Sequence, residues 1–255
     1  MEVITSQSDT ITEKSMTHNA PSMKTVICLP TYNEARNLPR ITEAILRALP
    51  ETSILVIDDN SPDGTGAIAD RMARENPQVS VLHRSRKEGL GRAYVEGFRT
   101  VLNHSDAKVI VQMDADFSHP PDRLPDMIQA ASEADLVIGS RYVAGGGTQN
   151  WGLCRRLISR FGSLYARLCL SLPVRDITGG FKAWHRELLE QVLSYPISSG
   201  GYGFQAETTF FAFRTGARIV ELPILFVDRN VGKSKMTAAI AFEAFWRLPL
   251  IRWQN

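Results

Sequence analysis

Short apolar runs alternate with longer segments of helical periodicity over most of the chain, and this alternation limits the possible folds more than any other feature. The runs have the length of strands, at residues 25–29, 54–57, 79–82, 108–113 and 135–138. Apolar residues recur at helical spacing near residues 38–49, 65–74 and 91–102. Alternating strands and helices indicate βαβ units, whose right-handed crossovers place helices on both faces. We therefore predict an α/β fold with a mostly parallel central sheet.

Polar motifs directly follow four of the predicted strands. They are PTYNE at 30–34, DDNSPDG at 58–64, DAD at 114–116 and GSR at 139–141. Ligands of open α/β sheets bind outside the carboxyl ends of the strands. Four polar clusters at one edge of the sheet therefore predict a binding site there. No GxGxxG follows the first strand, which counts against a dinucleotide site.

Asp114 and Asp116 form the clearest candidate for a metal site. In an extended segment their carboxylates point the same way, because the strand period is two. Two such carboxylates repel unless a cation lies between them, and oxygen ligands select Mg²⁺ or Mn²⁺. Alternatively, Asp116 caps the helix that follows the prolines at 120 and 121. The position at a strand end beside other motifs favours the metal.

Two other motifs suit a nucleotide and its phosphates. Tyr32 could stack on a base, and Glu34 could accept a hydrogen bond from a base or ribose, although this segment also fits a simple turn. Arg229 and Lys235 flank Gly232 after an apolar run at 219–227, where cations can close over phosphates. A basic surface loop is the alternative.

Charge is unevenly distributed. The net charge of +2 gives no reason to expect nucleic acid, but residues 139–182 alone carry seven cations and one acid. This local excess of positive charge suits an anionic ligand or an anionic membrane surface.

After a glycine run at 145–147, which we interpret as a flexible loop, an amphipathic helix is predicted. Its apolar stripe is Leu153, Leu157, Ile158, Phe161, Leu164, Tyr165, Leu168 and Leu172, and its other face is Arg156, Ser159, Arg160, Ser163 and Arg167.

The ends of the chain differ from its middle. Residues 1–22 are predicted to be a disordered tail, and residues 23–235 are predicted to form the folded domain. Residues 236–255 are predicted to be an amphipathic segment, with apolar aromatic residues at helical spacing: Phe242, Phe245, Trp246 and Trp253. That segment suits an interfacial membrane helix or a helix packed on the core. No secretory signal and no 18-residue apolar stretch is found, and the three scattered cysteines fit a reducing compartment. We therefore expect a cytoplasmic protein, peripheral on the cytoplasmic face of a membrane.

Taken together, the motifs resemble those of the family-2 glycosyltransferases, and within them the dolichol-phosphate (polyprenol-phosphate) mannosyltransferases. The resemblance runs from about residue 24 to 236 and rests on PTYNE at 30–34, DDNSPDGT at 58–65, DADFSHPP at 114–121, GSRY at 139–142, DITGGFK at 176–182, GYGFQAE at 201–207 and RNVGKSK at 229–235. It implies a GT-A (Rossmann-like) fold and transfer of mannose from GDP-mannose to dolichyl or polyprenyl phosphate.

The resemblance also implies roles for particular residues. The guanosine part of the donor would lie against Pro30, Tyr32, Glu34, Ile57 and Asp59. The donor diphosphate and its Mg²⁺ or Mn²⁺ would be held by Asp114, Ala115 and Asp116, with Ser118 at the position of a third metal ligand. Arg141, Arg229 and Lys235 would contact phosphates or sugar and, with Asp116, serve catalysis.

The acceptor of this reaction is a phosphate that is already ionised near neutral pH, so it needs positioning more than deprotonation. Arg156, Ser159 and Arg160 share one helical face and are our candidates to hold it. Glu207 is the candidate base by resemblance to other family-2 enzymes, and we expect it to matter little for proton transfer. Direct attack would invert the anomeric carbon. The alternatives are a UDP-glucose-dependent glucosyltransferase and a non-catalytic nucleotide-sugar-binding protein, and a membrane-protein partner is left open.

Overall fold

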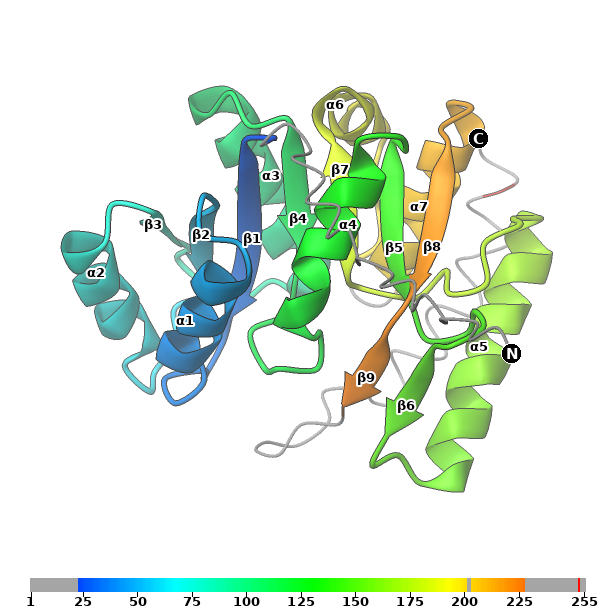
Figure 1. Ribbon diagram of the computed structural model, residues 1–255, viewed down its shortest axis with the longest axis horizontal. Helices are drawn as coiled ribbons and strands as arrows, with labels where there is room; N and C mark the ends of the chain where they lie inside the picture. The colour runs from blue at the N-terminus through cyan, green and yellow to red at the C-terminus, as the bar shows by residue number, and fades with distance from the viewer. Residues whose placement is uncertain (1–22, 201–202, 228–251, 253–255) are drawn as a thin grey trace, which may run out of the picture.

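The computed structural model describes residues 23–200, 203–227 and 252. A seven-stranded sheet forms its centre (Figure 1). From one edge to the other, its strands are β3 (Val79–His83), β2 (Ser53–Asp58), β1 (Thr25–Thr31), β4 (Val109–Gln112), β7 (Lys182–His185), β5 (Leu136–Ser140) and β8 (Ile219–Pro223). Only β7 runs antiparallel, to both of its neighbours. The predicted mostly parallel sheet is confirmed.

The apolar run at 219–227 forms two strands in the structure. β8 ends at Pro223, the main-chain N–H of Ile224 donates to the Ser140 carbonyl, and the chain continues into β9 (Leu225–Val227). β9 pairs with β6 (Gly147–Gln149) in a separate two-stranded sheet. Our interpretation of the glycine run as a flexible loop is therefore wrong at Gly147, which begins a strand.

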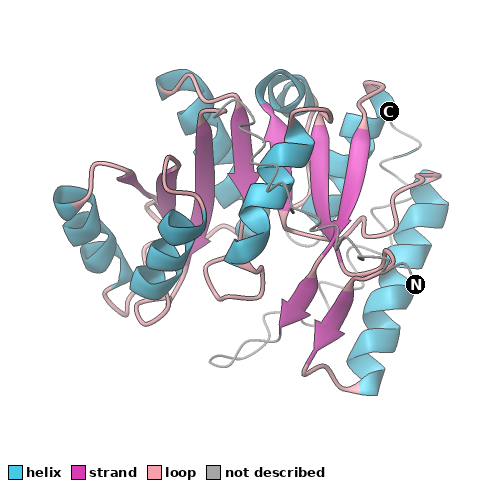
Figure 2. Ribbon diagram, viewed as in Figure 1, coloured by secondary structure: helices cyan, strands magenta, loops and turns pink. Residues whose placement is uncertain are grey.

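Helices cover both faces of the large sheet, as predicted (Figure 2). α1 (Leu38–Ala48), α2 (Thr65–Glu75) and α4 (Leu124–Ala131) contribute to one apolar cluster, while α3 (Leu90–His104), α6 (Arg186–Ser194) and α7 (Gly203–Arg214) contribute to the other. A short 3₁₀ turn at Pro121–Arg123 precedes α4. The helix α5 (Leu153–Leu170) lies at the β8 side of the molecule, next to the two-stranded sheet.

The alternation of β1 explains how one strand serves two layers. Val26 and Cys28 pack in the cluster beneath α3, whereas Ile27 and Leu29 pack in the cluster beneath α1. Successive side chains of a strand point to opposite faces, and a strand covered on both sides is apolar throughout. Packing on both faces therefore fixes the position of β1. Pro30 and Thr31 lie at the carboxyl end of this strand, where the candidate site begins.

Two predictions about the chain ends fall largely on residues that the structure does not describe. The predicted tail at 1–22 lies outside the described residues, and so does the amphipathic segment at 236–255 except for residue 252. Within the described part of the chain, no helix has the length and apolar character needed to cross a bilayer.

Candidate active site

The loops after β1 and β2 are joined into one surface by three hydrogen bonds from main-chain N–H groups. Asn33 donates to Ser61 Oγ at 3.1 Å, Glu34 to Thr65 Oγ1 at 3.0 Å, and Ala35 to Asp63 Oδ2 at 3.1 Å. The sheet register supports this arrangement, because Pro30 of β1 pairs directly with Ile57 of β2. The PTYNE and DDNSPDGT motifs therefore form a single structural unit, as their predicted common role requires.

The two adjacent carboxylates of the second motif have different surroundings. Asp58 accepts hydrogen bonds from Thr31 Oγ1, Ser61 Oγ and the Ser61 main-chain N–H, so its side chain builds the turn. Asp59 instead pairs with Arg84, whose guanidinium also donates to Glu96 at 2.7 Å. Burial raises the pKa of Asp59, and the contact with Arg84 opposes that shift.

Residues that follow β3 also lie at the predicted guanosine site. The Lys87 ammonium lies 3.8 Å from the centroid of the Tyr32 ring, and Arg84 contacts Asp59. Neither cation was predicted from the sequence, because the segment after β3 carries no recognisable motif. Two of the residues proposed to hold the guanosine, Tyr32 and Asp59, thus each lie beside a cation.

The DAD segment is held from both sides by buried aromatic residues. The Tyr94 hydroxyl of α3 donates to Asp114 Oδ1 at 3.1 Å, and the Asp114 main-chain N–H donates to His119 Nδ1 at 3.0 Å. His119 is buried, stacks on Phe181, and has a lowered pKa because of its burial. The ring is therefore neutral near pH 7, with its proton on Nε2.

The oxygen atoms in this segment fit a hard divalent ion. Asp116 is buried and its Oδ1 accepts the Ser118 main-chain N–H, while Ser118 Oγ is buried with no hydrogen-bond partner. A buried hydroxyl without a partner costs free energy unless a ligand satisfies it. Across the described residues, no three His, Cys, Asp or Glu side chains form a metal cage. Two carboxylates and a hydroxyl match the sparse protein ligation of Mg²⁺, which usually also binds substrate phosphates.

Arg141, at the end of β5, is held by a buried carboxylate from a distant part of the sequence. Asp176 Oδ2 accepts the Arg141 main-chain N–H at 2.8 Å and Nε at 2.7 Å, and Asp176 Oδ1 accepts Nη2 at 2.6 Å. The main-chain N–H groups of Arg175 and Asp176 in turn donate to Glu221 of β8. The planar guanidinium therefore has one defined orientation.

Lys182 is a buried cation that was not assigned a role from the sequence. It begins β7, and its Nζ donates to the Gln205 carbonyl at 2.8 Å and to Thr209 Oγ1 at 2.9 Å. Burial lowers the pKa of Lys182 to about 7, and the charge of Asp176 opposes the shift. Since its hydrogen bonds go to α7, Lys182 fastens that helix to the sheet beneath the site.

Both carboxylate oxygens of Glu207 already accept hydrogen bonds from the protein, which does not suit a general base. Its Oε1 accepts the main-chain N–H and the hydroxyl of Ser198, and its Oε2 accepts the Ser199 main-chain N–H at 2.8 Å. Glu207 is buried on α7. The carboxylate therefore holds the loop before α7 in place, and its expected minor role in proton transfer stays a prediction.

The three candidate acceptor residues lie on α5, where the structure separates their surroundings. Arg156 and Arg160 are exposed, whereas Ser159 Oγ forms a 2.7 Å hydrogen bond with the Tyr142 hydroxyl of the GSRY motif. One turn further along, Ser163 Oγ contacts Thr178 Oγ1, which accepts from Arg141 Nη2. α5 is thus joined through Ser163 and Thr178 to Arg141.

Arg229 and Lys235 lie outside the described residues, so their predicted contacts stay predictions.

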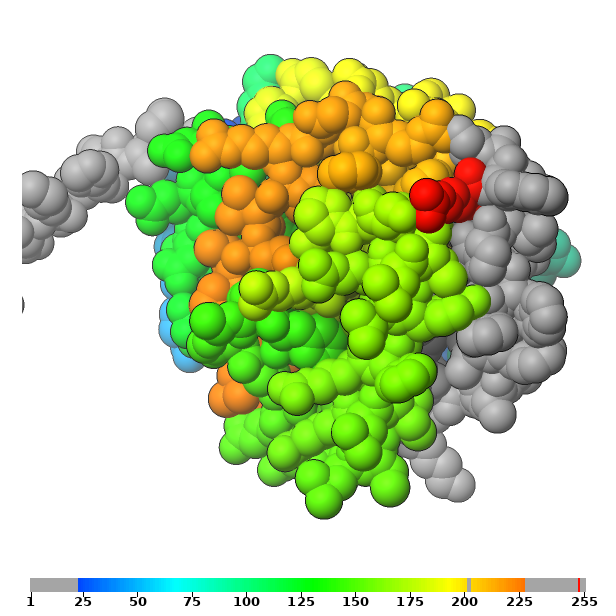
Figure 3. Space-filling view, turned by 90° about the vertical axis from the view of Figure 1, so that its right-hand side faces the viewer, coloured from blue at the N-terminus to red at the C-terminus, as the bar shows by residue number. Residues whose placement is uncertain are grey.

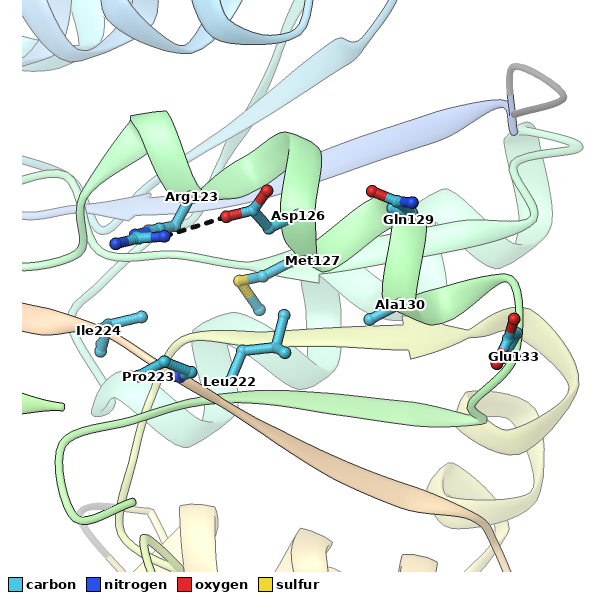
Figure 4. A pocket seen from close by; sticks show the side chains of 9 residues that line it. All are labelled: Arg123, Asp126, Met127, Gln129, Ala130, Glu133, Leu222, Pro223 and Ile224. Carbon is cyan, nitrogen blue, oxygen red and sulfur yellow. Dashed lines mark hydrogen bonds and ion pairs between the residues drawn. The ribbon is translucent and has the colours of Figure 1, made fainter. Parts of the chain in front are cut away.

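A cavity of about 460 Å³ lies elsewhere, between α4 and β8 (Figure 4). Met127 and Leu222 line it from the two elements, and Arg123 pairs with Asp126 at its rim. None of its lining residues belongs to the predicted site. The cavity is therefore separate from the chemistry described above.

Residues 26–193 match the family model described as Glycosyl transferase family 2. The chain is 48% identical over 231 residues to an undecaprenyl-phosphate mannosyltransferase of Micrococcus luteus, covering 91% of this chain and 94% of the relative. It is 44% identical over 230 residues to a polyprenol monophosphomannose synthase of Mycolicibacterium smegmatis, covering 89% and 86%.

Solved structures share the fold at low sequence identity. Glucosyl-3-phosphoglycerate synthase of Mycobacterium tuberculosis superposes with a TM-score of 0.68 at 18% identity, over 91% of this chain and 81% of that chain. A mannosyltransferase of Pyrobaculum calidifontis, solved in complex with GDP-Man and Mn²⁺, has a TM-score of 0.59 at 21% identity, over 83% and 58%. The predicted GT-A fold is confirmed.

Proposed function

Because the chain belongs to glycosyl transferase family 2, we propose that it transfers mannose from GDP-mannose to a polyprenyl phosphate such as dolichyl phosphate. One observation carries the proposal: two relatives named for mannosyl transfer to polyprenol carriers are 48% and 44% identical over nearly the whole of both chains. Transfer takes place at a membrane surface, because the acceptor's hydrocarbon chain resides in a membrane, and the face proposed is the cytoplasmic one.

The guanosine of the donor binds at the joined loops after β1 and β2. Pro30 and Ile57 form the floor, Tyr32 and Glu34 contact the base and ribose, and Asp59 accepts a hydrogen bond from the base. The contacts that hold these residues support the assignment, since three inter-loop hydrogen bonds and two neighbouring cations fix them before a ligand arrives. A fixed site loses less conformational entropy on binding.

Asp114, Asp116 and Ser118, with Ala115 between the carboxylates, are the residues that would hold Mg²⁺ or Mn²⁺ against the donor diphosphate. When bound, such an ion neutralises negative charge on the leaving diphosphate. The buried hydroxyl of Ser118 without a partner supports the assignment. Tyr94 orients Asp114 through its hydroxyl, so the carboxylate is positioned by the body of the protein.

Cationic side chains stabilise the charge that develops on the diphosphate. Arg141 is placed for this by Asp176, and Arg229 and Lys235 contribute from the segment after β9. Donors that are fixed before the reaction stabilise a developing charge without reorganising. The extensive anchoring of Arg141 therefore supports its catalytic assignment.

The acceptor phosphate attacks the donor directly. One of its oxygens forms a bond to the anomeric carbon while the bond to the GDP oxygen breaks, and GDP leaves with the bonding electrons. Arg156 and Arg160 hold the acceptor phosphate by charge-assisted hydrogen bonds, and Ser159 anchors the helix that carries them. No proton needs to be removed, which agrees with the engagement of Glu207 by Ser198 and Ser199. The anomeric carbon is inverted, giving a β-mannosyl phosphate.

A donor comparison tests the proposal. The purified chain would be assayed with GDP-mannose, GDP-glucose, UDP-mannose and UDP-glucose, with a short-chain polyprenyl phosphate as acceptor. We expect lipid-linked product from GDP-mannose only. Preferred use of UDP-glucose would assign the alternative glucosyltransferase activity, and binding of GDP-mannose without turnover of any donor would assign a non-catalytic protein.

A further inference from the structure

Trp151 has a buried indole N–H that no described residue accepts. The side chain is 7% exposed and lies in the short segment between β6 and α5. Its Nε1 atom is buried without a hydrogen-bond partner among the described residues. Leaving a buried donor unpaired costs free energy, so such a group in a folded protein requires an explanation. A ligand that accepts the hydrogen bond is one explanation.

The unpaired N–H alone does not indicate a ligand. Trp184 of β7 also has a buried Nε1 without a partner, but its side chain is fully buried in the apolar cluster beneath α3. Trp151 differs because two guanidinium groups lie against its ring. Arg155 Cζ is 4.4 Å from the Trp151 ring centroid, and Arg141 Cζ is 5.8 Å from it. Two cations beside an unpaired donor favour an anionic ligand.

The position of Arg155 on α5 directs its side chain toward the domain. Ser159 and Ser163 follow at spacings of four, and their hydroxyl groups bond to the domain. Arg155 therefore belongs to the face of α5 that meets the domain. It is half-buried there, whereas Arg156, predicted to hold the acceptor, is exposed. Figure 3 faces α5, whose yellow-green atoms form much of the visible surface. The pair of Arg155 and Trp151 thus lies where the helix joins the domain.

Aromatic contacts connect Trp151 to the candidate metal site. Its ring meets Phe226 of β9 edge-on, at 5.4 Å between ring centroids, and Phe226 in turn meets His119 at 5.8 Å. His119 accepts the main-chain N–H of Asp114 in the DAD segment. The indole is therefore joined to the DAD segment through two aromatic rings, and to the candidate acceptor helix through Arg155.

We propose that the Trp151 N–H donates a hydrogen bond to a phosphate oxygen of the acceptor, with Arg155 and Arg141 beside it. This inference rests on the proposed function and names further residues of its acceptor site. The acceptor is favoured over the donor because Trp151 directly precedes α5. The first turn of that helix contains no acidic residue, and Gly152 at its start provides no side-chain cap. The positive end of the helix therefore adds to the attraction for an anion.

Nuclear magnetic resonance of the indole groups tests the hydrogen bond directly. The full chain contains four tryptophans, so the signal that is lost in Trp151→Phe identifies the resonance of Trp151. A short-chain polyprenyl phosphate should move this N–H resonance downfield, as a hydrogen bond to an anionic oxygen does. The same polyprenol without its phosphate, and GDP, should not. An unmoved resonance at saturating polyprenyl phosphate, or an equal shift with polyprenol or GDP, would overturn the proposal.

Acceptor affinity measures what the hydrogen bond contributes. Trp151→Phe removes the N–H and keeps an aromatic ring. It should weaken binding of the polyprenyl phosphate about 10- to 100-fold, the range for a hydrogen bond to a charged group, and leave binding of GDP unchanged. Trp184→Phe is the matched control, because it removes a buried, unpaired N–H away from the site. It should bind both ligands as the unchanged chain does. Equal acceptor affinity in the two variants would contradict the proposal.

Unfolding by urea separates a binding role from a structural one. Since the Trp151 N–H has no partner in the free protein, Trp151→Phe should lower the midpoint no more than Trp184→Phe does. A larger loss would mean that the N–H supports the fold, and would overturn the proposal. A phosphate-dependent shift of the Trp151 resonance in a chain that transfers no mannose would retain the phosphate site and reject the proposed function. Mannose transfer without that shift would do the reverse.

Discussion

Replacing Asp176 with asparagine removes the charge that anchors Arg141 and keeps nearly the same side-chain shape. Asp176 is fully buried and accepts three hydrogen bonds from Arg141, through the main-chain N–H, Nε and Nη2. Removing one partner of a buried ion pair costs about 3–5 kcal/mol, because the other charge stays buried without compensation. Asparagine retains one acceptor oxygen, so we expect a loss near the lower value, about 3 kcal/mol. Domains are stable by only about 5–15 kcal/mol, so this is a large fraction.

Urea unfolding, followed by circular dichroism, measures this loss as a lower midpoint with an unchanged slope. Asp126→Asn is the matched control, because it is the same substitution in an exposed pair with Arg123 at 3.1 Å. That pair should contribute less than about 1 kcal/mol. If Asp176→Asn shifts the midpoint no more than Asp126→Asn does, the buried pair does not hold Arg141 and the reasoning is refuted.

Three further predictions concern the site and its supports. Asp116→Ala should abolish transfer while the circular dichroism spectrum is retained, and a chelator should inactivate the unchanged chain until Mg²⁺ or Mn²⁺ is restored. The free energy of unfolding should rise between about pH 7 and 10, by up to about 1.4 kcal/mol per pH unit, and Lys182→Met should remove this rise. The pKa of Lys182 is about 7 in the folded chain and higher in the unfolded chain, which therefore binds more protons in that range. Glu207→Gln should slow transfer equally from about pH 6.5 to 8, because it disturbs the loop at Ser198 rather than a proton transfer.

Each of these predictions has an outcome that contradicts it. Full activity in the presence of a chelator would show that transfer does not require a metal ion. An unchanged rise of stability with pH in Lys182→Met would assign the titration to another group. Loss of one limb of the pH–rate profile in Glu207→Gln would mean that the acceptor is deprotonated by this carboxylate.

The sequence predicted the parallel part of the fold well, because each buried strand is a continuous apolar run. β7 was missed for a physical reason. Its residues, Lys182–His185, include a buried lysine and a histidine, so the segment lacks the apolar signature of a central strand. The lysine is accommodated only because α7 offers the Gln205 carbonyl and Thr209 Oγ1 as acceptors, and this requires knowledge of the tertiary structure.

The candidate site was predicted where strand ends carry motifs and missed where contacts are long-range. The union of the PTYNE and DDNSPDGT loops follows from their places after neighbouring strands. Arg84 and Lys87 lack a motif, and Asp176 reaches Arg141 across 35 positions. The periodicity of α5 predicted an amphipathic helix correctly but could not show which face points outward. That depended on the close packing of Ser163 and Ala166 against the domain.

The configuration of the product is the most direct test of inverting mannosyl transfer to a lipid phosphate. Product formed from GDP-mannose and a short-chain polyprenyl phosphate would be isolated, and its anomeric centre and phosphodiester assigned by nuclear magnetic resonance. The account predicts a single β-mannosyl phosphodiester. An α-linked product would contradict direct attack by the acceptor phosphate, and release of free mannose without a lipid product would contradict the transferase itself.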